Sequence, residues 1–175
     1  MEPLIHFLIP FVALVLLGVD LKWSSLLAFP ALAPDLDALF LVHRSFTHSL
    51  PVLLAAATPL LLMIYWVKPK FMRYGFIGVL SVASHIALDL PAGYTPLLWP
   101  IYNYSVWIQL ELAAHIGSAP TLSLDLHILT EPIVFEVAGS LDAALLTGAD
   151  LIVSLIMLTP LFVKILNQRI KCARS

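Results

Sequence analysis

Residues 51–67 read PVLLAAATPLLLMIYWV, and residues 71–90 read FMRYGFIGVLSVASHIALDL. The short basic stretch Lys68-Pro69-Lys70 separates them. A helix needs roughly 20 mainly apolar residues to cross a bilayer, with about 17 as the lower limit. Both stretches meet this requirement, so they predict two consecutive membrane-spanning helices joined by a basic turn.

The composition extends this prediction to the whole chain of 175 residues. Hydrophobic residues make up 61% of the chain and charged residues 11%, whereas a soluble domain is about half apolar and about a quarter charged. These values exclude an ordinary soluble domain, and they exclude a disordered chain, which needs low hydrophobicity. The net charge of −2 gives no basic stripe and therefore argues against a nucleic-acid partner.

We therefore predict an all-α, polytopic membrane protein in which residues 1–175 form a single membrane-embedded domain. Apolar runs predict about five spans, at residues 3–19, 23–42, 51–67, 71–90 and 151–166. The segment 91–149 is more polar, and its aromatic residues between 94 and 107 favour a membrane interface. We expect this segment to form one or two interfacial helices packed over a site at the outer face.

The basic residues predict the orientation, because Lys and Arg are enriched in cytoplasmic loops. With the N-terminus outside, all of the nine basic residues except Arg44 fall on the inner side. We therefore predict a multi-pass protein of the cell (inner or plasma) membrane, with its N-terminus out and its C-terminus in the cytoplasm. This topology places one set of polar residues towards the outer ends of the first four spans: His6, Asp35, Asp37, His43, His48, His85 and Asp89.

Three short motifs carry most of these side chains: PDLD at 34–37, HRSFTHS at 43–49 and SHIALD at 84–89. His85 and Asp89 are four residues apart, so they share one face of a helix. Burying several carboxylates together is costly in a membrane, and Arg44 alone does not balance them. One or two divalent cations would, and imidazole with carboxylate suits zinc first, with manganese or iron also possible.

Each residue taken alone also has a structural explanation. His6 can be a hydrogen-bonded packing residue, Asp35 and Asp37 can cap a loop, and Arg44 can reach towards lipid phosphates. A hydrogen bond within one helix would explain His85 with Asp89. The convergence of all these residues on one side of the membrane favours a functional site instead. In the segment 91–149, Glu131 is the best further ligand or base, ahead of Glu136, Asp125 and His127.

These motifs, with Leu97-Leu98-Trp99-Pro100 after them, resemble the membrane-bound metal-dependent hydrolase family of bacteria and archaea. The resemblance covers about residues 6–100, and the family has a proposed likeness to zinc-dependent phospholipase C. It implies that the metal ligands are His6, Asp35, Asp37, His48, His85 and Asp89. It also implies that His43 is a ligand or a general acid/base and that Arg44 binds the substrate phosphate. Ser45 departs from the family pattern, in which Gly is common after the Arg.

The sequence thus predicts a membrane-embedded hydrolase that cleaves a phosphoester of a lipid or lipid-linked substrate by a metal-activated water. Asp37 or Glu131 would take the proton from that water. The alternative is a transporter of metal ions or protons that uses the same His/Asp cluster as its binding site. The almost purely apolar inner halves of the spans favour an enclosed site over a transport pathway.

Overall fold

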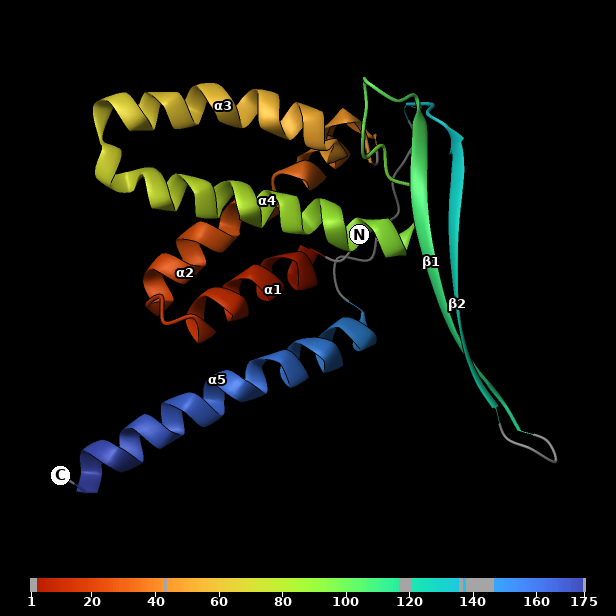
Figure 1. Cartoon of the computed structure of the whole chain (residues 1–175). Coiled ribbons are helices and arrows are strands. Elements are labelled where there is room, and N and C mark those ends of the chain that lie inside the picture. Colours follow the sequence, from red (N-terminus) through yellow and green to blue (C-terminus); the bar gives the residue numbers. More distant parts are fainter. Residues whose placement is uncertain (1–2, 43, 117–120, 136, 138–146, 175) are drawn as a thin grey trace.

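The computed structural model describes residues 3–42, 44–116, 121–135, 137 and 147–174 (Figure 1). Helices and a two-stranded sheet make up this part of the chain. The helices are α1 (Pro3–Leu16), α2 (Leu21–Ala28), α3 (Leu50–Val67), α4 (Met72–Ala92) and α5 (Gly148–Arg174), and the strands are β1 (Tyr104–His115) and β2 (Thr121–Pro132). Short 3-10 helices lie between them, namely η1 (Phe29–Leu32), η2 (Pro34–Phe40), η3 (Phe46–His48) and η4 (Pro69–Phe71).

Helices α3 and α4 form an antiparallel pair joined at η4 (Figure 1). Within the described residues, two helical segments are long and apolar enough to cross a membrane, Leu50–Val67 and Pro69–Ala92. They coincide with the predicted spans 51–67 and 71–90. Gly75 lets the two helices pack closely, because a Cβ atom there would lie 2.8 Å from Leu61 Cδ2 and 3.1 Å from Ile64 Cδ1.

The prediction of five spans is wrong. Helix α1 ends at Leu16 and, with 14 residues, is about 21 Å long, short of the roughly 30 Å hydrocarbon core. The fifth predicted span, 151–166, lies inside α5, which does not meet the spanning criterion over its described residues. The short elements α1, α2 and η1 instead pack against α4, and Ala28, Ala31 and Ile86 are fully buried there.

The predicted span 23–42 is broken into α2, η1 and η2. Asp20 caps α2 by accepting a hydrogen bond from the Trp23 backbone N at 3.1 Å. Pro30 and Pro34 then stand at the starts of the two 3-10 helices. Proline removes a backbone donor and clashes with the preceding helical turn, so a regular helix does not continue through this stretch.

The prediction of an all-α fold with interfacial helices over 91–149 is also wrong. The strands Tyr104–His115 and Thr121–Pro132 pair as an antiparallel hairpin, in which Tyr104 pairs with Pro132 and His115 with Thr121, while residues 117–120 lie outside the described residues. Apolar and polar residues alternate along both strands, and this period of two is that of a β-strand. Residues 138–146 of the same segment lie outside the described residues.

Helix α5 starts at a capping box and packs against α1. Thr147 N donates to Asp150 Oδ2 at 2.7 Å, and Asp150 N donates to Thr147 Oγ1 at 3.2 Å. Such reciprocal hydrogen bonds satisfy two backbone N–H donors that would otherwise lack acceptors at the start of a helix. Further along, Lys164 Nζ donates to the Val15 carbonyl at 2.8 Å, which ties α5 to the end of α1.

Candidate metal centre

Four elements bring ionisable side chains together beside the C-terminal part of α4. His6 comes from α1, Asp35 and Asp37 from η2, and His48 from η3. His85 and Asp89 project from α4, one helical turn apart. The side chains of all six are buried, with at most 12% of any of them exposed.

Four of these atoms form a compact group, which we call the ligand quartet: His48 Nε2, His85 Nε2, Asp35 Oδ1 and Asp89 Oδ2. The two imidazole nitrogens are 3.2 Å apart. His48 Nε2 lies 3.7 Å from Asp35 Oδ1 and 3.2 Å from Asp89 Oδ2. His85 Nε2 lies 3.6 Å and 3.5 Å from the same two oxygens.

Five of the separations within the quartet are close to the edge length of a zinc coordination tetrahedron. Nitrogen and oxygen ligands lie about 2.0–2.2 Å from zinc, so four of them in a tetrahedron are about 3.3–3.6 Å from one another. The five separations of the quartet run from 3.2 to 3.7 Å. Each of the two carboxylate oxygens therefore lies at ligand distance from both imidazole nitrogens, and His48, His85 and Asp89 form a group whose ligand atoms all lie within 4.8 Å of one another.

His6 lies beside the quartet. Its Nδ1 is 3.8 Å from Asp35 Oδ2, and its Nε2 is 3.7 Å from Asp89 Oδ1. Its ring centroid is 4.0 Å from that of His85. His6, Asp35 and His85 form a second group whose ligand atoms lie within 4.8 Å of one another. Because this group shares residues with the quartet, His6 can serve as a further ligand or act on a molecule bound beside the ion.

Asp37 faces the other side of His48. Its Oδ2 lies 3.4 Å from His48 Nδ1 and accepts hydrogen bonds from Ser45 N at 2.7 Å and Thr47 Oγ1 at 3.2 Å. Thr47 Oγ1 also lies 3.1 Å from His48 Nδ1. The Asp37 carboxylate favours a proton on Nδ1, and Nε2 faces His85 and Asp89. A carboxylate behind a ligating histidine is a common arrangement in metal sites.

The cluster contains buried polar atoms that lack hydrogen-bond partners among the described residues. They include both carboxylate oxygens of Asp35, the Oδ2 atom of Asp89, and the Nδ1 atoms of His6 and His85. Buried polar groups in proteins are almost always paired, and unpaired buried charges are costly. These oxygens have imidazole nitrogens as neighbours but no hydrogen bond, so a cation among them would compensate their charge.

Electrostatics within the cluster are dominated by the carboxylates. Burial lowers the pKa of His48, but close contacts with the carboxylates of Asp35, Asp37 and Asp89 outweigh it and raise that pKa to about 10. Burial raises the pKa of Asp37, yet its hydrogen bonds with His48 and Ser45 outweigh that effect and leave the pKa below its ordinary value. The site therefore favours ionised carboxylates and positive charge among them.

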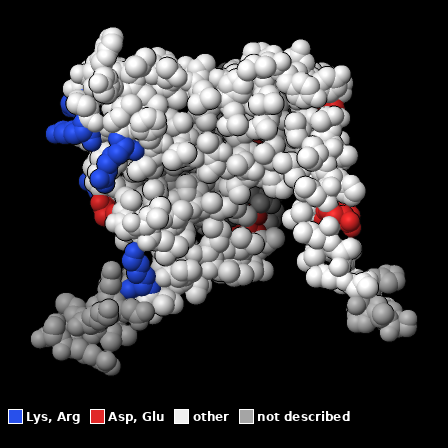
Figure 2. Space-filling view, viewed as in Figure 1, with Lys and Arg blue, Asp and Glu red and all other residues white. Residues whose placement is uncertain are grey.

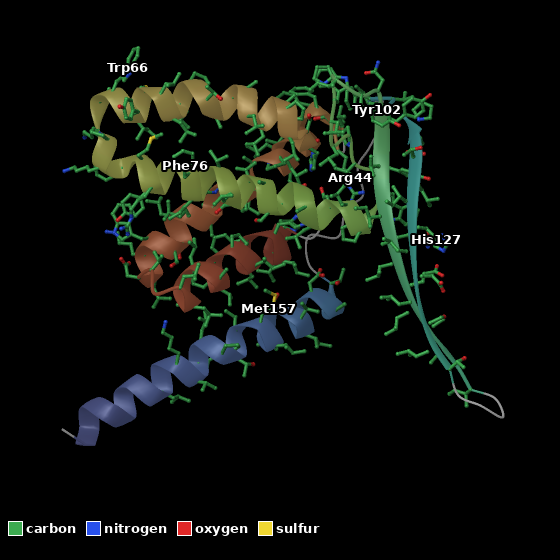
Figure 3. The ribbon with its side chains drawn as sticks, viewed as in Figure 1. Arg44, Trp66, Phe76, Tyr102, His127 and Met157 are labelled. Atoms are coloured by element: carbon green, nitrogen blue, oxygen red, sulfur yellow. The ribbon has the colours of Figure 1, made fainter. Side chains whose placement is uncertain are left out.

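Arg44 closes the cluster on the side of the loop after α4 (Figure 3). Its Nη2 lies 3.2 Å from Asp89 Oδ1, and its Nη1 donates to the Tyr94 carbonyl at 3.4 Å. Gly93 makes room for the guanidinium group, because a Cβ atom at this position would collide with Arg44 Nη1. The Nε atom of Arg44 is buried and lacks a hydrogen-bond partner in this part of the structure.

Two predicted site residues remain, His43 and Glu131. His43 lies outside the described residues. Glu131 is exposed on β2, opposite Ser105 on β1, and does not belong to either group of converging ligand atoms found among the described residues. Sequence reasoning overlooked Ser45 and Thr47 as partners of Asp37, although their hydroxyls stand within the 43–49 motif beside His48.

An apolar cavity of about 370 Å³ adjoins this region. Asp37, Ser45 and Thr47 form its polar wall. The remainder of the lining is apolar and comes from η2, the following loop and the start of η3: Leu36, Phe40, Val42 and Phe46.

A family model matches residues 1–168 of the chain, and it describes the YdjM inner membrane protein family. Searches of curated proteins and of solved structures gave no match.

Proposed function

Because the chain belongs to the YdjM inner membrane protein family, we propose that it is a membrane-embedded, metal-dependent hydrolase acting on a phosphoester of a lipid or lipid-linked substrate. The family description gives a membrane location and no activity, so the reaction is our proposal. The observation that carries it is the ligand quartet, whose separations of 3.2–3.7 Å suit one divalent cation.

The quartet and its neighbours would divide the work of hydrolysis. His48, His85, Asp35 and Asp89 would hold one ion, zinc first by the donor set, with manganese or iron as alternatives. An ion held there would supply Lewis-acid activation of a water molecule. His6 lies outside the quartet and has an unpaired Nδ1, so it is placed to accept a proton or to bind a second ion.

Arg44 and the apolar cavity suit the two ends of a lipid phosphoester. Guanidinium groups bind phosphate through paired hydrogen bonds, and Arg44 keeps an unpaired Nε beside the cluster. The cavity that shares Asp37, Ser45 and Thr47 with the cluster is apolar over the remainder of its wall. It would take the hydrocarbon next to the phosphate while the phosphate meets Arg44.

The expected base residues need revision under this proposal. Asp37 is committed to Ser45, Thr47 and the far side of His48, so we assign it to positioning His48. Glu131 is exposed on the hairpin. His6 therefore replaces both as the proposed proton acceptor.

The transporter alternative has less support. Beyond the cluster, the polar side chains of α4 are satisfied by their own helix: Ser84 Oγ donates to Ser81 O at 2.7 Å, and Ser81 Oγ donates to Ile77 O at 3.1 Å. The space between α3 and α4 is lined mainly by apolar residues. A transport pathway would need polar groups through the depth of the membrane.

We propose that the cluster faces the outer side of the inner membrane. Figure 2 shows Lys and Arg gathered at the end of the molecule where α3 turns into α4, and acidic side chains on the hairpin at the other end. Basic residues are enriched on the cytoplasmic side, so the turn at Lys68–Arg73 would be cytoplasmic. Helix α5 runs towards that same end (Figure 1), which agrees with an N-terminus out and a C-terminus in.

Elemental analysis of the detergent-purified protein tests the metal centre. The wild type should carry one or two equivalents of a transition metal, and the double variant His85→Ala with Asp89→Ala should lose it. Ser84→Ala on the same helix is the matched control and should keep the wild-type content. Full metal content in the double variant would refute the ligand assignment.

Phosphate release from vesicles containing phosphatidate or phospholipids tests the reaction. We expect release by the metal-loaded wild type, loss of release with a chelator, and a large decrease for Arg44→Lys with metal content unchanged. A loaded protein that releases no phosphate or phosphorylated headgroup from any of these lipids would overturn the hydrolase proposal and leave a metal-binding protein.

A further inference from the structure

The β1–β2 hairpin has two chemically different faces. The register pairs Leu110 with Leu126 and Leu112 with Leu124 on one face, and Gln109 with His127 and Glu111 with Asp125 on the other. The same alternation continues along both strands and makes one face apolar. This face carries Ile108, Leu110, Leu112, Ala114, Leu122, Leu124, Leu126 and Ile128. The other face is polar and acidic over most of its length.

The apolar face is exposed. The exposed fractions of Leu112, Leu124 and Ile128 are 67%, 65% and 64%, and every residue of β2 is exposed. Contiguous apolar patches of this kind are uncommon on soluble monomers and mark binding surfaces. A two-stranded hairpin is at best marginally stable in water, so a surface that covers the apolar face would stabilise the hairpin.

The base of the hairpin is fixed to the helical body next to the metal centre. Thr95 and Val106 exchange backbone hydrogen bonds of 2.9 and 2.8 Å. Trp107 Nε1 donates to the Pro91 carbonyl at the end of α4, at 3.2 Å. These bonds hold the strands against the end of α4, a few residues from the Tyr94 carbonyl that binds Arg44.

The direction of the strands is informative. They run across the end of α4, transverse to the axes of α3 and α4 (Figure 1). His127, on the polar face, points away from the helices (Figure 3). Beyond the base, where Trp107 of the polar face meets the end of α4, the apolar face looks towards the side on which the two candidate spans lie (Figure 3). If those spans cross the bilayer, the strands lie parallel to its surface, with apolar residues towards the lipid and acidic residues towards water.

We propose that the β1–β2 hairpin is a lipid-seated element: its apolar face rests in the boundary between headgroups and acyl chains of the outer leaflet. Residues 104–132 contain neither Lys nor Arg, so the attraction comes from apolar burial and not from anionic lipids. The outer edges of the hairpin carry unpaired backbone groups, which cannot enter the hydrocarbon core. The hairpin therefore rests at headgroup depth, as amphipathic surface elements do.

Labelled cysteines on the two faces test this inference without using activity. Cys172, the single cysteine of the chain, is first replaced in Cys172→Ser. Leu124→Cys then labels the apolar face and Ser123→Cys the polar face. Both positions are exposed, so neither variant disturbs a packed core. The full-length protein is reconstituted in phosphatidylcholine vesicles, and each site carries an environment-sensitive fluorophore.

We expect lipid-borne bromine to quench the label at 124 several-fold more than the label at 123, and aqueous iodide to show the reverse order. The pair Leu126→Cys and Asp125→Cys should repeat this result. Adding anionic lipid or salt should leave it unchanged. Equal iodide quenching at 123 and 124 would overturn the inference, because the hairpin would then stand free in water. The inference would also be overturned if the label at 124 were protected from iodide only at high protein concentration and were not quenched by brominated lipid. A second copy of the chain would then cover the apolar face.

Discussion

The variant Asp37→Asn distinguishes a metal ligand from a residue that positions one. The carboxylate of Asp37 approaches His48 Nδ1 at 3.4 Å and is absent from the quartet. An asparagine can direct its amide oxygen either to the donors Ser45 N and Thr47 Oγ1 or to His48, and its amide nitrogen is a donor. A donor facing His48 Nδ1 favours the tautomer with its proton on Nε2, the atom that would bind the ion.

The expected loss follows from this second-layer role. Replacing a carboxylate behind a ligating histidine typically lowers metal affinity about 10–100-fold, which corresponds to about 1.4–2.8 kcal/mol. The number of ions bound should stay that of the wild type. Zinc titration against a competing chelator, with the protein in detergent, measures both quantities. Asp125→Asn makes the same chemical change on the exposed hairpin and should leave the affinity unchanged.

Two results would refute this reasoning. If Asp37→Asn binds no ion, as expected for Asp35→Asn, then Asp37 is itself a ligand. If its zinc affinity equals that of the wild type, the carboxylate does not set the tautomer of His48.

Two further predictions concern the helical frame. Gly75→Val should destabilise the α3–α4 pair by about 1–3 kcal/mol, because the new side chain meets Leu61 and Ile64. Gly78→Val should cost much less, since a Cβ there has no neighbour within 4 Å. Denaturation in mixed micelles compares the two variants, and equal losses of stability would contradict the packing argument. Asp150→Ala should remove one half of the capping box at α5, which is worth about 0.5–2 kcal/mol. Backbone hydrogen exchange of residues 147–150 should then become faster, while that of α4 stays unchanged. Unaltered exchange at the start of α5 would show that the capping box does not stabilise this helix end.

The sequence predicted the candidate site better than the fold. His85 and Asp89 are fixed one turn apart by the helical period, so their shared face follows from spacing alone. The meeting of His6 and His48 with them was inferred from a common membrane depth, and the structure brings these residues together. The separate role of Asp37 could not be inferred, because two aspartates at i and i+2 of a 3-10 helix point to different neighbours.

The errors in the fold have identifiable causes. Overall hydrophobicity suggested a span over 23–42, although Pro30 and Pro34 interrupt any regular helix there. In the segment 91–149 the aromatic content favours a membrane interface, whereas the strict alternation of Leu122, Leu124 and Leu126 with polar residues is typical of a strand. That period of two was the available signal for a strand.

The origin of the quartet in three separate elements, η2, η3 and α4, bears on how the protein is made. Asp35 and His48 are synthesised well before His85 and Asp89, which lie one helical turn apart in α4. The three elements cannot enclose an ion until α4 has been synthesised, so Asp35 and His48 are made before the histidine and the carboxylate that α4 supplies. Capture of the ion would then act as a checkpoint in biogenesis, since it locks the first ninety residues together only after the pair α3–α4 is complete.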